Sequence, residues 1–169
     1  MSAEQHSFTL SVFSDSPLKT GAVSDIYPFR HSVTHAWHLQ NAGGNAQSPT
    51  YSINPQFKLT IPPSTADTGA DILLLLESRN ELSIHVKLVW GGGRRVTTVT
   101  NKDIIAESGE YRRGCALAEK RGLEPGDYTI VASTFERGQV GDFVLTVIGS
   151  EDIGLEIIRA ETAVMYPLL

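Results

Sequence analysis

The sequence predicts an all-β protein, folded as an antiparallel sandwich of eight to ten short strands. Apolar and polar side chains alternate with a period of two residues in most segments, as in strands wetted on one face. Turns rich in glycine, proline and asparagine separate these segments. No segment shows the period of an amphipathic helix, and strand and helix patterns do not alternate as they do in parallel sheets.

Size, charge and cysteine content limit the classes of function. With 169 residues, the chain is long enough for one domain with a substantial core. Its formal net charge is −5, so it has no basic excess to neutralise phosphates, and we expect no nucleic-acid partner. The single cysteine, Cys115, excludes an internal disulfide and a multi-cysteine zinc site. The polar start, M-S-A-E-Q-H-S, lacks a signal-peptide pattern, and together these features predict a cytoplasmic protein.

The first half of the chain holds four predicted strands. Residues 8–13, 33–39 and 56–61 alternate apolar with polar side chains. Residues 14–32 contain Ser, Asp, Pro and Gly with no sustained period, which predicts a long connection. Residues 72–77, I-L-L-L-L-E, are apolar on both faces, and their short length and flanking turns favour a buried central strand over a helix.

The stretch from residue 37 to residue 61 is predicted to organise the fold as strand, tight glycine loop and strand. Gly43 and Gly44 permit positive φ angles in the loop. Pro55 stands at the strand entrance, where its missing N–H costs no ladder hydrogen bond. Pro55 also disfavours helical backbone at Asn54, which we therefore expect to be extended.

The clearest alternation covers residues 82–90. It predicts that Trp90 points into the core and that His85 and Lys87 lie on the polar face of the strand. Three glycines then break the pattern, and the β-branched residues 94–100 predict the second strand of a hairpin.

The rest of the chain alternates again after two unclear segments. Residues 102–109 could hold a helical turn, and residues 111–120 fit a strand or a short helix. A Pro-Gly turn then introduces the last three predicted strands, at residues 128–132, 142–148 and 155–159.

The patterns also predict the domain organisation. Residues 33–160 form the predicted sandwich, with a strand and linker at 1–32 and a tail at 161–169. The sequence F-T-L-S-V near the N-terminus resembles F-V-L-T-V at residues 143–147. Any two alternating strands look alike, so coincidence is one explanation. The alternative is that residues 8–13 close an upstream copy of the same fold.

Two segments carry a family resemblance. The first reads W-x4-A-G-G…Y-x2-N-P-Q-F-x-L over residues 37–59, and the second reads L-x-P-G-D-Y-T-I-V-A-S-T-F-E…G-D-F-V-L-T-V over residues 123–147. In order and spacing, both resemble the C2-like β-sandwich of calpains, called domain III. The resemblance covers about residues 33–150 and implies a C2-like, jelly-roll sandwich of about eight strands. The positions that carry it, each with an expected structural role, are Trp37, Gly43, Gly44, Asn54, Pro55, Gln56, Phe57, Pro125, Gly126, Tyr128, Phe135, Gly141 and Phe143.

The acidic residues depart from the pattern of the common calpains. Those calpains carry a dense acidic loop implicated in calcium response, whereas here the acids are scattered, in pairs such as Asp67 with Asp71. No local run of carboxylates could gather six or more oxygens on one cation, so we expect no cofactor, and calcium stays open as a ligand without the support of a dense acidic loop. With the upstream copy, this departure indicates atypical calpains with tandem C2-like domains, the calpain-seven and PalB-like branch. The resemblance then implies a cytosolic protease linked to endosomal sorting proteins of ESCRT type and, in fungi, to ambient-pH signalling.

The sequence offers no convincing catalytic or metal-binding set. A papain-like core needs a thiolate, a base histidine and an orienting amide, and the segment R-R-G-C-A-L-A around Cys115 does not resemble its nucleophile motif. Adjacent arginines could lower the pKa of Cys115, but a buried small hydrophobe is the better interpretation. His31, His35 and His38 would align on a helix, but in a strand His38 points opposite to His35. We predict satisfied or exposed histidines there and at His85, no metal site, and catalytic residues outside this chain.

One region is basic in an otherwise acidic chain. Three glycines followed by Arg94 and Arg95 suit an anion, because glycine amides and guanidinium groups bind phosphate. The region lacks the G-K-[ST] ending of a phosphate-binding loop, so a flexible hairpin tip is the alternative. With Lys87, Arg112 and Arg113, it is the predicted contact for an anionic membrane or an acidic peptide.

These observations support one function and keep others open. The predicted function is that of a non-catalytic regulatory and interaction domain of a calpain-type cysteine protease. It would support the protease core and a neighbouring C2-like domain, and would bind a protein partner or a membrane surface. The alternative is a stand-alone membrane-targeting module that binds calcium or phospholipid. A third hypothesis, an enzyme that uses Cys115, lacks a recognisable base.

Overall fold

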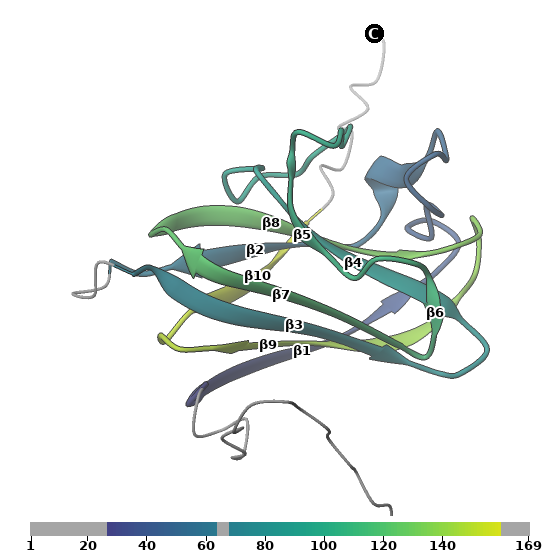
Figure 1. The fold of residues 1–169 in the computed structure, drawn as a ribbon. Helices are drawn as coiled ribbons and strands as arrows, with labels where there is room; N and C mark the ends of the chain where they lie inside the picture. The colour runs from purple at the N-terminus through teal and green to yellow at the C-terminus, as the bar shows by residue number, and fades with distance from the viewer. Residues whose placement is uncertain (1–26, 64–67, 160–169) are drawn as a thin grey trace, which may run out of the picture.

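The computed structural model describes residues 27–63 and 68–159, which form two antiparallel sheets packed face to face (Figure 1). The first sheet has the strand order β1-β9-β3-β7, and the second has the order β10-β2-β8-β4-β5, with β6 paired to β4. The all-β antiparallel sandwich is thereby confirmed. The elements are β1 (Phe29–Trp37), the 3-10 turn η1 (Tyr51–Ile53), β2 (Gln56–Ile61), β3 (Ala70–Ser78), β4 (Ser83–Val89), β5 (Ile104–Glu107), β6 (Arg112–Arg113), β7 (Cys115–Leu123), β8 (Gly126–Thr134), β9 (Gly141–Gly149) and β10 (Gly154–Ile158).

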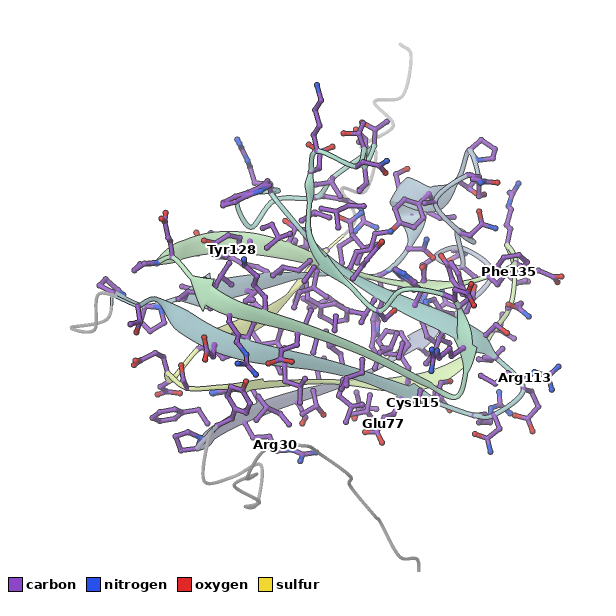
Figure 2. All side chains as sticks on the ribbon, viewed as in Figure 1. Arg30, Glu77, Arg113, Cys115, Tyr128 and Phe135 are labelled. Carbon is purple, nitrogen blue, oxygen red and sulfur yellow. The ribbon has the colours of Figure 1, made fainter. Side chains whose placement is uncertain are left out.

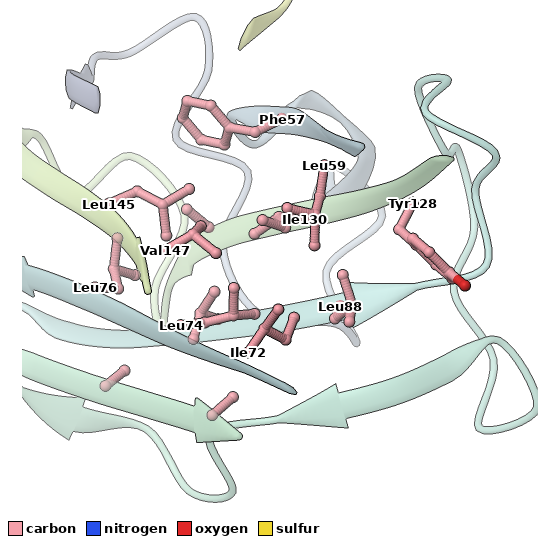
Figure 3. Close-up of a cluster of buried hydrophobic side chains, with 14 of the residues drawn as sticks. Phe57, Leu59, Ile72, Leu74, Leu76, Leu88, Tyr128, Ile130, Leu145 and Val147 are labelled. Carbon is pink, nitrogen blue, oxygen red and sulfur yellow. The ribbon is translucent and has the colours of Figure 1, made fainter. Parts of the chain in front are cut away.

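The core lies between the sheets and consists of the alternating apolar side chains (Figure 3). Leu74 of β3 and Val147 of β9 contribute from the first sheet, and Leu59 of β2 and Ile130 of β8 contribute from the second. All four are fully buried, as expected for a period of two with one face turned to the opposite sheet. The N-terminal strand predicted at residues 8–13 lies outside the described residues. Within the described part, no helix is long and apolar enough to cross a bilayer.

The outer face of the second sheet is covered by the protein's own loops, which the sequence did not predict. Tyr51 of η1 and Val96 of the loop after β4 pack on Val131 of β8. Strand β4 is therefore buried on both faces, and the prediction that His85 and Lys87 lie on a solvated face is wrong. The exposed fractions of these residues are only 2% and 8%.

Residues 94–100 are not a strand, because a side chain satisfies their backbone. Gln56 accepts a hydrogen bond from the Val96 N–H (2.8 Å) and donates one to the Val96 carbonyl (2.9 Å). The next strand along the chain, which pairs with β4, is β5, where a helical turn had been allowed. The unclear segment near residue 115 is strand β7.

Two large apolar side chains are exposed, although the alternation predicted that they would lie on the apolar face of a strand. Strand β4 ends at Val89, so Trp90 is 60% exposed and rests against the ring of Tyr128, with 5.3 Å between ring centroids. Strand β1 ends at Trp37, and Leu39, which continued the predicted alternation, is 79% exposed.

The predicted organising stretch is held together by the side-chain amide of Asn54. This fully buried amide accepts a hydrogen bond from the Gly43 N–H (3.0 Å) and donates to the carbonyls of Gly44 (2.8 Å) and Tyr51 (2.9 Å). Gly44 has a φ angle of 80°, and a side chain at Gly43 would collide with the Thr50 carbonyl. The backbone of Asn54 is extended, with ψ at 154°, as expected before a proline.

The covered face contains a polar cluster between β4, β5 and β8. Lys87 forms an ion pair with Glu107, and His85 Nε2 lies 3.8 Å from the same carboxylate. The ring of Tyr111 lies over His85, with 4.8 Å between centroids, and its hydroxyl is 2.8 Å from that of Ser133. Burial, with a smaller contribution from Lys87, lowers the pKa of His85 to about 4.

Replacement of Asn54 by alanine tests the role of the buried amide. Asn54→Ala should lower the free energy of unfolding by about 2–4 kcal/mol, because it removes the side-chain partner of the Gly43 N–H and of the Gly44 carbonyl, whereas the Tyr51 carbonyl keeps the Asn54 N–H. Urea denaturation measures this difference. Asn101→Ala, in an exposed loop position, is the matched control and should change it by no more than about 0.5 kcal/mol. A small effect of Asn54→Ala would contradict the assigned role.

His85 should make the fold sensitive to acid. Its folded-state pKa lies below the ordinary value of 6.5, so protons bind the unfolded chain more readily. Its stabilising contribution is complete above pH 6.5 and is lost as pH falls toward 4, by on the order of 1–3 kcal/mol. Denaturation at several pH values should show a smaller loss in His85→Gln, and an unchanged loss in the exposed control Asn101→Ala. Equal losses in wild type and His85→Gln would contradict the prediction.

Candidate functional site

Cys115 has the wrong surroundings for a nucleophile. It is exposed at the start of β7, directly opposite Glu77 of β3, so the expectation of a buried thiol is wrong (Figure 2). No hydrogen bond joins it to a histidine within the described part of the chain. In residues 27–63 and 68–159, no three His, Cys, Asp or Glu side chains are grouped so that they could hold a metal ion.

The histidines of β1 divide between the surface and a groove. His31 Nε2 lies 3.0 Å from an Asp152 carboxylate oxygen at the surface. His35 is half-buried, edge-on to Phe143 at 5.8 Å, and burial followed by the effect of His38 lowers its pKa. Because β1 ends at Trp37, His38 is not part of the strand and does not point away from His35. Both imidazoles line one groove, with 6.5 Å between their rings.

The five residues of the predicted basic contact do not form one surface. Lys87 is buried in its ion pair with Glu107. Arg112 and Arg113 are exposed opposite the first residues of β4, whereas Arg94 is exposed beyond its last residue. The Arg94 carbonyl accepts a hydrogen bond from Thr129, next to Tyr128, and Figure 2 shows Tyr128 and Arg113 at opposite ends of the sandwich.

Arg95 has a separate role at the side of the sandwich. Its guanidinium group donates to the carbonyls of Ile53 (3.1 Å), Asn54 (3.0 Å) and Ile158 (3.4 Å), and burial lowers its pKa. It lines a groove of about 660 Å³ between the β1 edge of the first sheet and the β10 edge of the second. Sequence reasoning missed this groove because its walls come from segments more than 100 residues apart; it had singled out Arg95, His35, His38 and Pro55, but each for a different role.

The outer face of the first sheet is partly exposed around an apolar centre, and Thr146 and Ile148 on this face are buried. Leu73 and Leu75 of β3 and Val144 of β9 are half-buried on it, and Leu117 of β7, directly opposite Leu75, is 52% exposed. Charged and polar side chains surround this centre; Figure 2 labels Arg30, Glu77 and Cys115 along the same side of the molecule. Tyr27 precedes β1 at one edge of the sheet, and its hydroxyl donates a hydrogen bond to Glu119 of β7 at the opposite edge (3.3 Å). This is the surface of the sandwich best suited to contact another folded domain.

Several of the motif residues have structural contacts. Trp37 donates from its indole N–H to the Ala132 carbonyl (3.1 Å) and packs on Phe143, with 4.2 Å between ring centroids. The Tyr128 hydroxyl donates to the Glu124 carbonyl (2.8 Å), which fastens the turn before β8. Phe135 is half-exposed and packs edge-on to Tyr111.

Comparisons with known proteins agree with this architecture. A family model described as calpain large subunit, domain III, matches residues 91–148. The calpain-like protease palB of Emericella nidulans is 42% identical over 171 residues, a match that covers 95% of this chain and 20% of the relative. The calpain-like protease palB/RIM13 of Aspergillus oryzae is 50% identical over 141 residues, covering 83% of this chain and 16% of the relative.

A more distant match lies in a protein with a different name. The serine/threonine-protein kinase 4 homolog B of Dictyostelium discoideum is 26% identical over 129 residues, covering 71% of this chain and 11% of that protein. The chain thus spans a fifth or less of each of these relatives.

Domain III is a non-catalytic domain, and the catalytic core of these calpain-like proteases lies outside the matched region. The chain therefore belongs to the calpain domain III family, in the branch of the PalB calpain-like proteases.

Proposed function

We propose that this domain supports the protease core of a calpain-like cysteine protease and docks on it through the outer face of the first sheet. The observation that carries the proposal is the difference between the two outer faces. Loops of the chain cover the second sheet, whereas the first sheet presents Leu73, Leu75 and Leu117 at its surface. An apolar centre with a charged rim is the usual composition of a contact between folded domains.

The rigidity of the sandwich suits a supporting role. The two central strands of the first sheet, β3 and β9, pair over seven consecutive residues and bury their inner side chains completely. A flat face on such a sheet holds its side chains in fixed relative positions, which favours an oriented contact over a mobile one. We also propose a cytoplasmic location, supported by the single cysteine and by the family resemblance, and endosomal-sorting partners, supported by the resemblance alone.

A charge placed in the apolar centre tests the docking face. In the full-length protease, Leu117→Glu should reduce proteolytic activity and increase hydrogen exchange in β7, because a carboxylate would be buried in the contact. The matched control is Leu39→Glu, which adds the same charge at an exposed leucine beyond the end of β1. Both variants should keep the wild-type Tm of this domain. Wild-type activity and exchange in Leu117→Glu would contradict the proposal.

A second candidate function, binding to an anionic membrane, is supported by Trp90. Its exposed indole lies at one end of the sandwich beside Arg94, and tryptophan with arginine suits the interface between lipid and water. This candidate predicts that the chain sediments with phosphatidylserine vesicles and that Trp90→Ala does not. Leu39→Ala is the control for the loss of an exposed apolar side chain.

Neither docking on the protease core nor membrane binding should require calcium. The described residues contain no cluster of acidic side chains that could supply the six or more oxygens that calcium takes. We therefore expect the same Tm and the same vesicle sedimentation in calcium as in EDTA. A rise in Tm on addition of calcium would contradict this prediction.

A further inference from the structure

The groove between β1 and β10 contains a cation that no acidic residue of the described chain neutralises. Arg95 is half-buried there and donates to three backbone carbonyls. In residues 27–63 and 68–159, no carboxylate lies within ion-pair distance of its guanidinium group. A guanidinium group has five N–H donors, so two remain after these three hydrogen bonds. Partly buried charge of this kind favours an anionic ligand.

The other residues that line the groove also carry no negative charge. His35 and His38 line one side and Arg159 lines another, and none of the residues that line the groove is acidic. Apolar surface from Pro55 and Ile157 lies between these polar groups. The groove therefore combines an apolar surface with donors and cations, which suits a ligand that has both apolar side chains and a carboxylate.

Strand β10 gives the groove a backbone edge. It is the last strand of the second sheet, paired with β2 on one side only within the described residues. Ile157 and Ile158, at its C-terminal end, line the groove. An unpaired edge offers N–H and C=O groups to an extended peptide, which adds as a further strand and places alternate side chains into adjacent pockets. This feature favours a peptide over a free small anion.

We propose that the groove binds an extended segment of a partner protein that carries an aspartate or glutamate, with the carboxylate accepting hydrogen bonds from Arg95 and the backbone pairing with β10. This site is distinct from the docking face on the first sheet. It assigns Arg95 to a binding surface that Arg94, Arg112 and Arg113 do not share.

The first test uses the full chain and two labelled peptides that differ in one group. The probes are fluorescein-labelled Val-Thr-Asp-Val-Thr-Val and its Asp-to-Asn counterpart, and fluorescence anisotropy measures binding. The aspartate peptide should bind at least about tenfold more tightly, as expected for a charge-assisted hydrogen bond. Amide shifts in NMR spectra should concentrate at Ile157 and Ile158. Equal binding of the two peptides, or shifts elsewhere, would overturn the proposal.

Three variants separate an effect on binding from an effect on folding. Arg95→Gln should weaken the aspartate peptide about tenfold, but it also removes contacts that fasten the loop. Thr97→Glu is therefore the decisive variant, because Thr97 is exposed, lines the groove and would place a carboxylate in it. Its neighbour Thr98 is exposed and does not line the groove, so Thr98→Glu is the control for added charge. Equal losses in Thr97→Glu and Thr98→Glu would reject the site.

One further variant tests whether the groove binds a partner protein or a segment of the chain itself. The sequence has an acidic residue, Glu161, two positions after Arg159, so Glu161→Gln tests whether the chain itself supplies the carboxylate. If Glu161→Gln binds the aspartate peptide and wild type does not, the occupant is the chain's own tail, and the partner proposal is overturned. Leu117→Glu should leave peptide binding unchanged, so failure of this proposal and failure of the docking face are distinguishable.

Discussion

The side-chain amide of Asn54 is the constraint on which the covered sheet depends. It joins the glycine loop after β1 to the turn before β2 by three hydrogen bonds in a fully buried setting. The turn carries Tyr51, which packs on Val131 and so covers the outer face of the second sheet. A mobile loop could not exclude water from that face, because each polar group beneath it would gain more from hydration than from a loose contact.

The covered face explains why the two sheets differ so much in chemistry. Beneath the loops, His85, Lys87 and Ser133 are buried. Glu107 forms an ion pair with Lys87, and Tyr111 shares a hydrogen bond with Ser133 and packs its ring on His85. On the outer face of the first sheet, Thr146 and Ile148 are buried, but Leu117 is 52% exposed. One side of the sandwich is therefore closed by loops, and the other is closed only in part. The docking proposed above uses this less covered side.

The local sequence pattern predicted much of the fold. The wrong predictions concern residues whose surroundings come from segments far away in the sequence. Alternation located β2, β4 and β9 to within about a residue or two, because a sheet face turned to a core imposes a period of two. The same rule misjudged His85, since alternation identifies one buried face and cannot reveal that a distant loop covers the other. Residues 94–100 have strand propensity, yet the amide of Gln56, about 40 residues away, binds their backbone instead. The groove was not predicted either, because its walls come from segments far apart in the sequence.

The arginines show how position, and not residue type, decides what a cation can do. Arg112 and Arg113 are solvated at the sandwich surface, where water screens their charge. Arg95 is held against the carbonyls of Ile53 and Asn54, so the turn that the Asn54 amide fixes also orients the guanidinium group. A cation oriented by rigid backbone loses less entropy on meeting an anion than a mobile one does. The contact that closes one face of the sandwich therefore also positions the charge at its edge.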